Sequence, residues 1–408
     1  MRESNPPSSL RHYYQKKKLQ VAYRNLKNQE HLDAFVEQRK NFLAQKLSLP
    51  VDYFEGKKIL EFGPGSGENS MCFAIQGAEL TLVEPNLDSH GHIVSYFDQF
   101  DLMDSLKLLS SETLESFSQG GVFDFIDAEG FLASVRPEQL WINVIWGHLK
   151  PNGLLLMSYF ERHGSFFERY INVLGKIITF RHGSNSNAHT LQFNFTKKLM
   201  LNKWKSIGSQ RSFETWYMDH IISPYSTLNY NFDAVTLVNL LSQHGFLVHS
   251  SCPNYLDKVN VDWYKHIPKK EEQAKSCKEF IKRNSLSFML GRKCFFTGSQ
   301  SDLITYYKII NKILVGIGNI EEQFEATTIL NLEEDLEELI QFVEGSQNNF
   351  YMPEHTHVVA LLNLIKSGLI MAQQDDKSEL VKTLADNVAF MNWWGSPVHY
   401  LVLRKSRL

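Results

Sequence analysis

The chain has 408 residues, of which 43% are hydrophobic and 12% aromatic, so it is long enough for two domains with well-packed cores. Its formal charge of -3 gives no overall signature of nucleic-acid binding, although a local basic face is compatible with it. The four cysteines are widely spaced, and the sequence shows neither a signal-peptide segment nor an apolar run of membrane-span length. We therefore expect a globular protein of the reducing cytoplasm, without a membrane span.

The N-terminal part of the chain divides into a basic arm and an amphipathic helix. Residues 1–28 are polar, with three lysines at 16–18, which is typical of a solvated arm or a loosely docked helix. Residues 29–47 carry apolar side chains at helical spacing and end before Pro50, which predicts a helix with one buried face. We expect this helix to cover an edge of a neighbouring sheet or the mouth of a ligand site.

Residues 57–86 hold the most informative pattern in the chain. An apolar run at residues 58–62 leads into a glycine turn, GPGSG at residues 63–67, and a helical stretch and a second apolar strand follow. This second strand ends in Glu84. Glycines let the backbone approach a ligand, the helix start offers free N–H groups, and a carboxylate at that strand end suits a ribose diol. The pattern therefore predicts a ligand that contains a nucleoside.

The spacing within the turn separates two classes of nucleotide site. A dinucleotide fingerprint needs a third glycine where this chain has Glu68, whose carboxylate would repel a pyrophosphate. The series Glu61-x-Gly63-x-Gly65-x-Gly67, with Glu84 after it, instead resembles motif I and the next acidic motif of class I S-adenosylmethionine-dependent methyltransferases. A glycine-rich turn in some other α/β fold is the alternative interpretation.

The resemblance implies an α/β fold with a seven-stranded Rossmann-like sheet and S-adenosylmethionine as the cofactor. In this family the glycine loop lies under the methionine moiety, the first strand-end acid helps to hold its ammonium group, and the second acid binds the ribose hydroxyls. The leading helix often lies over the cofactor, which makes Arg39 and Tyr53 further candidates. The residues that match the cofactor-binding motifs are Glu61, Gly63, Pro64, Gly65, Ser66, Gly67, Glu84 and Pro85.

The family's order of elements continues along the chain. Glu112, in the exit loop of the third strand, matches a position that commonly bonds the adenine amino group. Asp127, Ala128 and Glu129 follow the fourth strand at the carboxyl end of the sheet, where open α/β sheets bind ligands, and two carboxylates suit a sulfonium. The expected elements are helices at 87–100 and 137–149, and strands at 105–109, 122–126 and 154–159.

A long aromatic-rich insertion, at about residues 160–230, follows the fifth strand. Insertions at this point usually form the acceptor lid in this family, so the candidates for a catalytic base are His163, Asp219 and His220. Asp127 and Glu129, after the fourth strand, are alternative candidates. A helix at 232–244, a sixth strand at 245–252 and an antiparallel seventh strand at 285–292 would complete a methyltransferase domain of residues 29–299. Residues 300–408 are predicted to form a helical C-terminal domain, which is also a candidate homodimer interface.

Several acceptor classes have sequence marks that this chain lacks. DNA adenine methyltransferases carry an Asn/Asp-Pro-Pro-aromatic tetrad after the fourth strand, where this chain has DAEG at residues 127–130. Pyrimidine C5 methylation needs a cysteine nucleophile in that region, and no cysteine lies between Cys72 and Cys252. Protein arginine methyltransferases use two glutamates on this loop, and Glu129 matches only one of them.

The leading hypothesis is therefore a methyltransferase that acts on an oxygen or nitrogen of a small metabolite, glycan or natural product. RNA as the acceptor, bound through the basic residues 11–27, stays open as an alternative. So does a catalytically silent cofactor-binding subunit whose helical region recruits a partner. His355 and His357 have no acidic or cysteine cluster near them in the sequence, so we assign no metal.

Overall fold

The computed structural model describes residues 10–17, 26–119, 121–182, 187–208, 211–257, 269–374 and 376–406. Within the predicted N-terminal arm, the first described helix is α1 (Leu10–Lys17), and residues 1–9 and 18–25 of the arm lie outside the described residues. The chain folds into two compact units. We call the first the sheet unit (Met1–Tyr159, Val235–Phe280 and His399–Leu408) and the second the helical unit (Phe160–Ala234 and Ile281–Val398).

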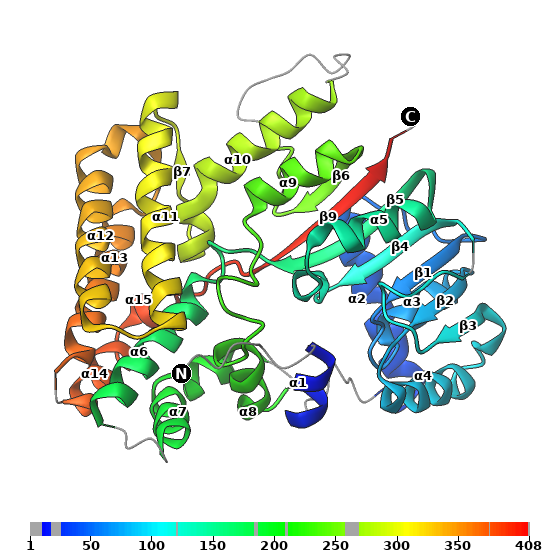
Figure 1. Cartoon of the computed structure of the whole chain (residues 1–408), viewed down its shortest axis with the longest axis horizontal. Coiled ribbons are helices and arrows are strands. Elements are labelled where there is room, and N and C mark those ends of the chain that lie inside the picture. The colour runs from blue at the N-terminus through cyan, green and yellow to red at the C-terminus, as the bar shows by residue number, and fades with distance from the viewer. Residues whose placement is uncertain are drawn as a thin grey trace. The chain divides into compact units, whose positions relative to one another are not determined.

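The sheet unit is built on a seven-stranded sheet with the strand order β3-β2-β1-β4-β5-β9-β6 (Figure 1). The first five strands in this order run parallel to one another, and β9 runs antiparallel to β6. The predicted seven-stranded Rossmann-like sheet is therefore confirmed. Its strands are β1 (Lys58–Phe62), β2 (Glu79–Val83), β3 (Leu106–Ser110), β4 (Phe123–Glu129), β5 (Leu149–Phe160), β6 (Phe246–Cys252) and β9 (Val398–Lys405).

The helices of the sheet unit pack on the strands through apolar side chains at helical spacing. Val36 and Leu43 of α2 belong to the same buried cluster as Phe73 of α3, Phe97 of α4 and Phe125 of β4. The start of α2 is capped by a side chain, since Asn28 accepts a hydrogen bond from the His31 amide. The helices are α2 (Gln29–Leu47), α3 (Glu68–Ile75), α4 (Leu87–Gln99), α5 (Glu138–His148) and α9 (Ala234–Gln243), and α10 (Lys270–Leu290) begins in this unit.

The seventh strand does not lie where the sequence predicts it. Residues 285–292 are expected to form an antiparallel strand, but they lie in α10 up to Leu290, and β9 near the end of the chain takes that place. A short apolar run such as 285–290 fits a buried helix and a buried strand equally well, and here the preceding helical turns continue through it. The C-terminal region 300–408 is therefore not helical throughout, because its last strand completes the sheet.

The helical unit combines the insertion after β5 with the C-terminal helices around one core. This division differs from the predicted boundary at residue 299, because the insertion packs with the C-terminal helices: Arg169 and Glu321, 152 residues apart, are in contact. The elements are α6 (Phe166–His182), α7 (Ala188–Ser206), α8 (Phe213–Trp216), the π-helical turn Tyr217–Ile221, β7 (Phe295–Phe296), α11 (Gln300–Glu322), α12 (Ala326–Gly345), β8 (Phe350–Tyr351), α13 (His355–Ala372), α14 (Lys377–Ala385) and α15 (Val388–Met391).

One helix in the described part of the chain, α13, is long and apolar enough to cross a membrane by length and composition. Its residues Leu361, Leu362 and Ile365 are buried in the core of the helical unit. A core helix of a globular protein has the same length and apolar composition, so this helix by itself does not indicate a membrane protein.

Candidate active site

The glycine turn joins β1 to α3 and takes a backbone conformation that favours glycine. Gly63, Gly65 and Gly67 have φ values of 69°, 60° and 89°, in the left-handed region. A Cβ atom at Gly63 would lie 3.2 Å from the ring of Phe131. The amide of Gly65 donates to Glu84 Oε2 at 3.0 Å, which ties the turn to the end of β2. The predicted strand-turn-helix-strand unit is therefore present.

Three carboxylates form a row at the carboxyl end of the sheet. Parallel pairing sets Glu61 of β1 beside Asp127 of β4, and Glu129 lies two residues further on the same face of β4. Residues 127–129 are predicted to follow the fourth strand, but β4 extends through them because they pair with β5. The guanidinium of Arg39, from α2, pairs with Glu129 through its Nη2, which also lies 3.6 Å from Asp127 Oδ2.

Burial and mutual repulsion make this acidic row unfavourable without a further cation. Burial raises the pKa of Glu61 to about 7, although Ser70 Oγ donates a hydrogen bond to it at 2.6 Å. Burial, followed by the charges of Glu129 and Glu61, raises the pKa of Asp127 well above its usual value. Asp127 is 1% exposed, and neither carboxylate oxygen has a hydrogen-bond donor among the described residues. A positively charged ligand group would relieve this repulsion.

A cavity of about 350 Å³ lies beside the acidic row, within the size range of small-molecule sites. The helix α2 supplies Phe35, Gln38, Arg39 and Phe42, whose spacing sets them on one side of the helix. Tyr400 of β9 adds a second aromatic wall, with its ring 4.8 Å from that of Phe42. The other lining residues are Pro64, Glu68, Asn69 and Glu129. The leading helix thus lines the mouth of the candidate site, as predicted.

Some of these cavity residues are predicted from the sequence and others are not. Arg39 is predicted and lines the cavity, whereas Tyr53 is predicted but packs edge-to-face on Phe54 and Phe125. Tyr400 is not predicted, because the strand that carries this residue is expected elsewhere. The signal is nevertheless present, since residues 398–403 form a short run of valine, tyrosine and leucine interrupted by one histidine.

The residues around the cavity fit S-adenosylmethionine. The acidic row would hold a cationic ammonium or sulfonium group, since Asp127 lacks a donor among the described residues. Arg39 Nε, which has no acceptor among the same residues, would pair with a carboxylate. Glu84 lies at the end of β2, where the family binds the ribose, and its two oxygens accept the amides of Gly65 and Asn86. Its contact with a ribose stays a prediction.

The remaining predicted cofactor residues occupy the expected strand ends. Ser66 Oγ donates to Glu68 Oε2 at 2.6 Å within the glycine turn. Glu112 follows β3 and accepts a hydrogen bond from Ser110 Oγ at 3.0 Å. Their contacts with a cofactor stay predictions, as do those of Pro64, Pro85 and the fully buried Ala128. Within the described ranges, no three His, Cys, Asp or Glu side chains are grouped as a metal site.

Two of the base candidates lie in the π-helical turn of the helical unit. Asp219 Oδ2 accepts a hydrogen bond from Arg211 Nη1 at 2.7 Å and lies 3.7 Å from His220 Nε2. Burial lowers the pKa of His220 below its usual value, so its imidazole is neutral near pH 7 and can accept a proton. The neighbouring Trp216 is buried in the core of the unit, which assigns it to packing.

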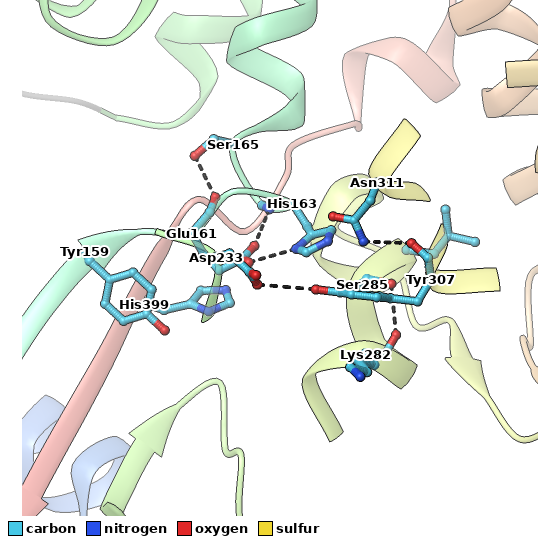
Figure 2. A network of polar contacts seen from close by, with 12 residues as sticks. Tyr159, Glu161, His163, Ser165, Asp233, Lys282, Ser285, Tyr307, Asn311 and His399 are labelled. Atoms are coloured by element: carbon cyan, nitrogen blue, oxygen red, sulfur yellow. Dashed lines mark hydrogen bonds and ion pairs between the residues drawn. The ribbon is translucent and has the colours of Figure 1, made fainter. Parts of the chain in front are cut away.

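The third base candidate, His163, is paired with a buried carboxylate. Its Nδ1 lies 2.9 Å from Glu161 Oε1, and Glu161 Oε2 accepts the amide of Gly164 at 2.7 Å (Figure 2). Burial alone would lower the pKa of His163, but Glu161, with a smaller contribution from Asp233, raises it above its usual value. The pairing with Glu161 favours the protonated form of His163 and occupies its Nδ1. The geometry therefore favours His220 over His163 as a base.

Comparison with known proteins identifies a family for this chain. The chain matches a family model described as a methyltransferase domain over residues 29–251, more than half of its length. No curated protein matches the sequence. Among solved structures, TehB from Haemophilus influenzae is 16% identical at a TM-score of 0.24, covering 30% of this chain and 46% of TehB. The N-methyltransferase NodS from Bradyrhizobium japonicum WM9, in complex with S-adenosyl-L-homocysteine, is 18% identical at a TM-score of 0.27, covering 36% of this chain and 74% of NodS.

A third solved structure, StiE O-MT residues 961–1257, is 9% identical at a TM-score of 0.34, covering 99% of this chain and 84% of that one. The chain spans less than half the length of TehB, and at these identities and TM-scores the solved structures assign no acceptor. The family match, in contrast, includes α2, the glycine turn, the acidic row and the strands β1 to β5. The chain therefore belongs to the S-adenosylmethionine-dependent methyltransferases of class I fold.

Proposed function

We propose that this protein transfers a methyl group from S-adenosylmethionine to an oxygen or nitrogen of a small metabolite, glycan or natural product. The observation that carries the proposal is the row of Glu61, Asp127 and Glu129, whose charge the described residues leave partly unbalanced, beside a cavity of about 350 Å³. We place this activity in the cytoplasm, which agrees with the four cysteines, all of them free thiols.

The residues of the sheet unit would hold and orient the donor. When bound, S-adenosylmethionine supplies the methyl group, which its sulfonium makes electrophilic. The acidic row attracts the positive end of this molecule, while Phe35, Phe42 and Tyr400 give the cavity apolar walls that exclude water. Transfer to a nucleophile is an in-line displacement, so alignment supplies most of the catalysis. These residues therefore need to position the reactants rather than to react themselves.

A hydroxyl or an ammonium acceptor must also lose a proton, and we assign this step to His220. Its neutral imidazole can take the proton, and Asp219, 3.7 Å away, would stabilise the imidazolium that forms. We expect His220→Ala to lower turnover by about 100-fold, the scale of general-base catalysis, while the affinity for S-adenosylmethionine stays unchanged. An equal loss of cofactor affinity would instead indicate a structural role.

The first test is binding of the cofactor and its demethylated product by calorimetric titration. A largely enclosed nucleoside and amino acid should bind with a micromolar dissociation constant, on the order of -7 to -8 kcal/mol. The assignment as a methyltransferase would be overturned if neither ligand gave heat or thermal stabilisation while a nicotinamide dinucleotide did bind.

The second test incubates the purified protein with methyl-labelled S-adenosylmethionine and cell extract. Label in the small-molecule or glycan fraction supports the proposal, and Gly65→Val serves as the negative control. Label that ribonuclease releases would instead identify RNA as the acceptor. Cofactor binding without label in any fraction would identify a silent cofactor-binding subunit.

A further inference from the structure

The helical unit contains a second, much smaller polar cavity that the cofactor site does not use. It has a volume of about 10 Å³, which is the space for one water-sized group. Glu168 and Arg169 of α6 line it together with Asn231, which lies before α9. His220 of the π-helical turn also lines it. The base candidate of the proposed reaction thus borders this cavity.

Three of the lining residues are buried and have unused hydrogen-bonding atoms. Glu168, Arg169 and Asn231 are 7%, 1% and 6% exposed. Glu168 Oε2, Arg169 Nε and both side-chain amide atoms of Asn231 have no hydrogen-bond partner among the described residues. Buried polar atoms in native proteins are normally paired, so four such atoms on three residues that line one small cavity indicate a polar guest.

The chemistry of these four atoms limits what the guest can be. Arg169 Nε only donates, while the Asn231 amide donates through Nδ2 and accepts through Oδ1. A guest that only donates, such as an ammonium, would be repelled by the Arg169 guanidinium. A carboxylate is too large for the volume of about 10 Å³. A hydroxyl group fits, because one oxygen can both donate and accept.

The residues that line this cavity also hold the segment that carries the base. Arg169 donates through Nη2 to the backbone carbonyl of His220, and Ser226 Oγ donates to that of Asp219. Arg169 is itself fixed by Glu321, whose Oε1 accepts from its Nη1 at 2.9 Å. The cavity and the imidazole are therefore parts of one fixed arrangement, so a group in the cavity is placed beside His220.

We propose that this cavity is a recognition site for a hydroxyl group of the methyl acceptor, held by Glu168, Arg169 and Asn231. The inference rests on the proposed function and makes it more specific, since it requires a hydroxylated acceptor such as a glycan or a polyhydroxylated metabolite. In the absence of acceptor, a water molecule would make the same hydrogen bonds.

The test uses the full-length protein with methyl-labelled S-adenosylmethionine and the extract fraction that gains label. Asn231→Leu keeps the size of the side chain and removes its polar atoms. We expect it to raise the apparent KM for the acceptor fraction by about tenfold or more, with kcat changed by less than about threefold. Glu168→Gln keeps the shape of the Glu168 side chain and should also raise KM. The Kd for S-adenosylmethionine should not change in either variant.

Thr196→Val is the matched control, because the hydroxyl of Thr196 is also buried and without a partner among the described residues but does not line the cavity. It should leave KM unchanged. An unchanged KM in both Asn231→Leu and Glu168→Gln, with a raised melting temperature for Asn231→Leu, would show that the cavity holds only water and would overturn the inference.

Mass spectrometry of the labelled product gives an independent criterion. A product with no oxygen-bearing group other than the methylated one would also overturn the recognition site, while leaving the proposed activity intact. Absence of transfer by the wild-type protein would remove the proposed function and this inference together.

Discussion

Two buried charged clusters, one in each unit, differ in how completely their polar atoms are paired. In the helical unit Glu321 Oε1 accepts from Arg169 Nη1 at 2.9 Å and Asn172 Nδ2 at 3.1 Å, and its Oε2 accepts the amide of Leu228 at 3.1 Å. In the sheet unit both oxygens of Asp127 lack a donor among the described residues. Both clusters are buried, yet the first joins helices, whereas the charge of the second is only partly balanced by the described residues and would suit a cationic ligand group.

The largest expected effect comes from breaking the paired cluster. Glu321→Ala leaves Arg169 as a buried cation without its carboxylate and removes the acceptor of the Leu228 amide, so we expect a loss of about 3–5 kcal/mol of unfolding free energy. Urea unfolding followed by circular dichroism measures this loss. Glu322→Ala is the control, because it removes the same charge from the exposed next residue, and it should cost less than about 1 kcal/mol. Equal unfolding free energies of the two variants would show that Glu321 does not stabilise the packing of these helices.

The next effect concerns the turn beside the unpaired cluster. Gly65→Val puts a side chain at a residue with φ of 60° in the glycine turn, so we expect at least about 100-fold weaker binding of S-adenosylhomocysteine. Calorimetric titration measures it. Gly56→Val is matched in backbone strain, with φ of 66°, but it lies outside the glycine turn, and its Cβ would meet nothing within 4 Å. Equal losses in the two variants would mean that backbone strain alone, rather than the ligand site, explains the result.

The part of this site that could be predicted from sequence is local or fixed by strand order. The glycine turn and Glu84 follow from residues 57–86 alone. Glu61 and Asp127 are far apart in sequence, yet a parallel sheet with adjacent β1 and β4 must bring their strand ends together. The pairing of Arg39 with Asp127 and Glu129 joins residues far apart in the sequence, but it can be predicted once α2 is expected to cover the carboxyl end of the sheet.

What could not be predicted depends on long-range packing. Residues 285–290 and 398–405 are both apolar enough for a strand, and only the complete fold decides that the second pairs with β6. The contact of Arg169 with Glu321 joins helices 152 residues apart in the sequence, and neither helix carries a local signal of the other. For the same reason the small cavity around Asn231 has no sequence motif, since its lining comes from separate segments.

A third prediction concerns the unfolding free energy, which substitutions in the two clusters should change in opposite directions. Burial, followed by the charges of Glu129 and Glu61, raises the pKa of Asp127 in the folded protein. The protein therefore loses stability as pH rises from the unfolded-state pKa of Asp127 towards this raised value, and Asp127 destabilises the empty protein at neutral pH. Asp127→Asn should therefore raise the unfolding free energy by on the order of 1 kcal/mol, opposite in sign to Glu321→Ala. The same substitution should weaken the binding of S-adenosylhomocysteine by about 1–3 kcal/mol, because a charge-assisted hydrogen bond to the ligand is lost. A destabilised Asp127→Asn protein would show that Asp127 is structurally paired, contrary to this comparison.

The smallest expected effect is a pH dependence of cofactor binding set by Glu61. Because its pKa is about 7, this carboxyl gains a proton as pH falls and attracts a cationic group less strongly. Uptake of one such proton predicts that the Kd for S-adenosylhomocysteine rises about 8-fold between pH 7.5 and pH 6.

Glu61→Gln removes the titrating group, so its Kd should be higher at pH 7.5 than that of the wild-type protein and should vary less over the same pH range. Asp127 can contribute part of the pH dependence that remains in Glu61→Gln. The Glu61→Gln, Asp127→Asn double variant should therefore show no pH dependence of Kd from the acidic row. A slope that is identical in the wild-type and double-variant proteins would place the titrating group outside the acidic row.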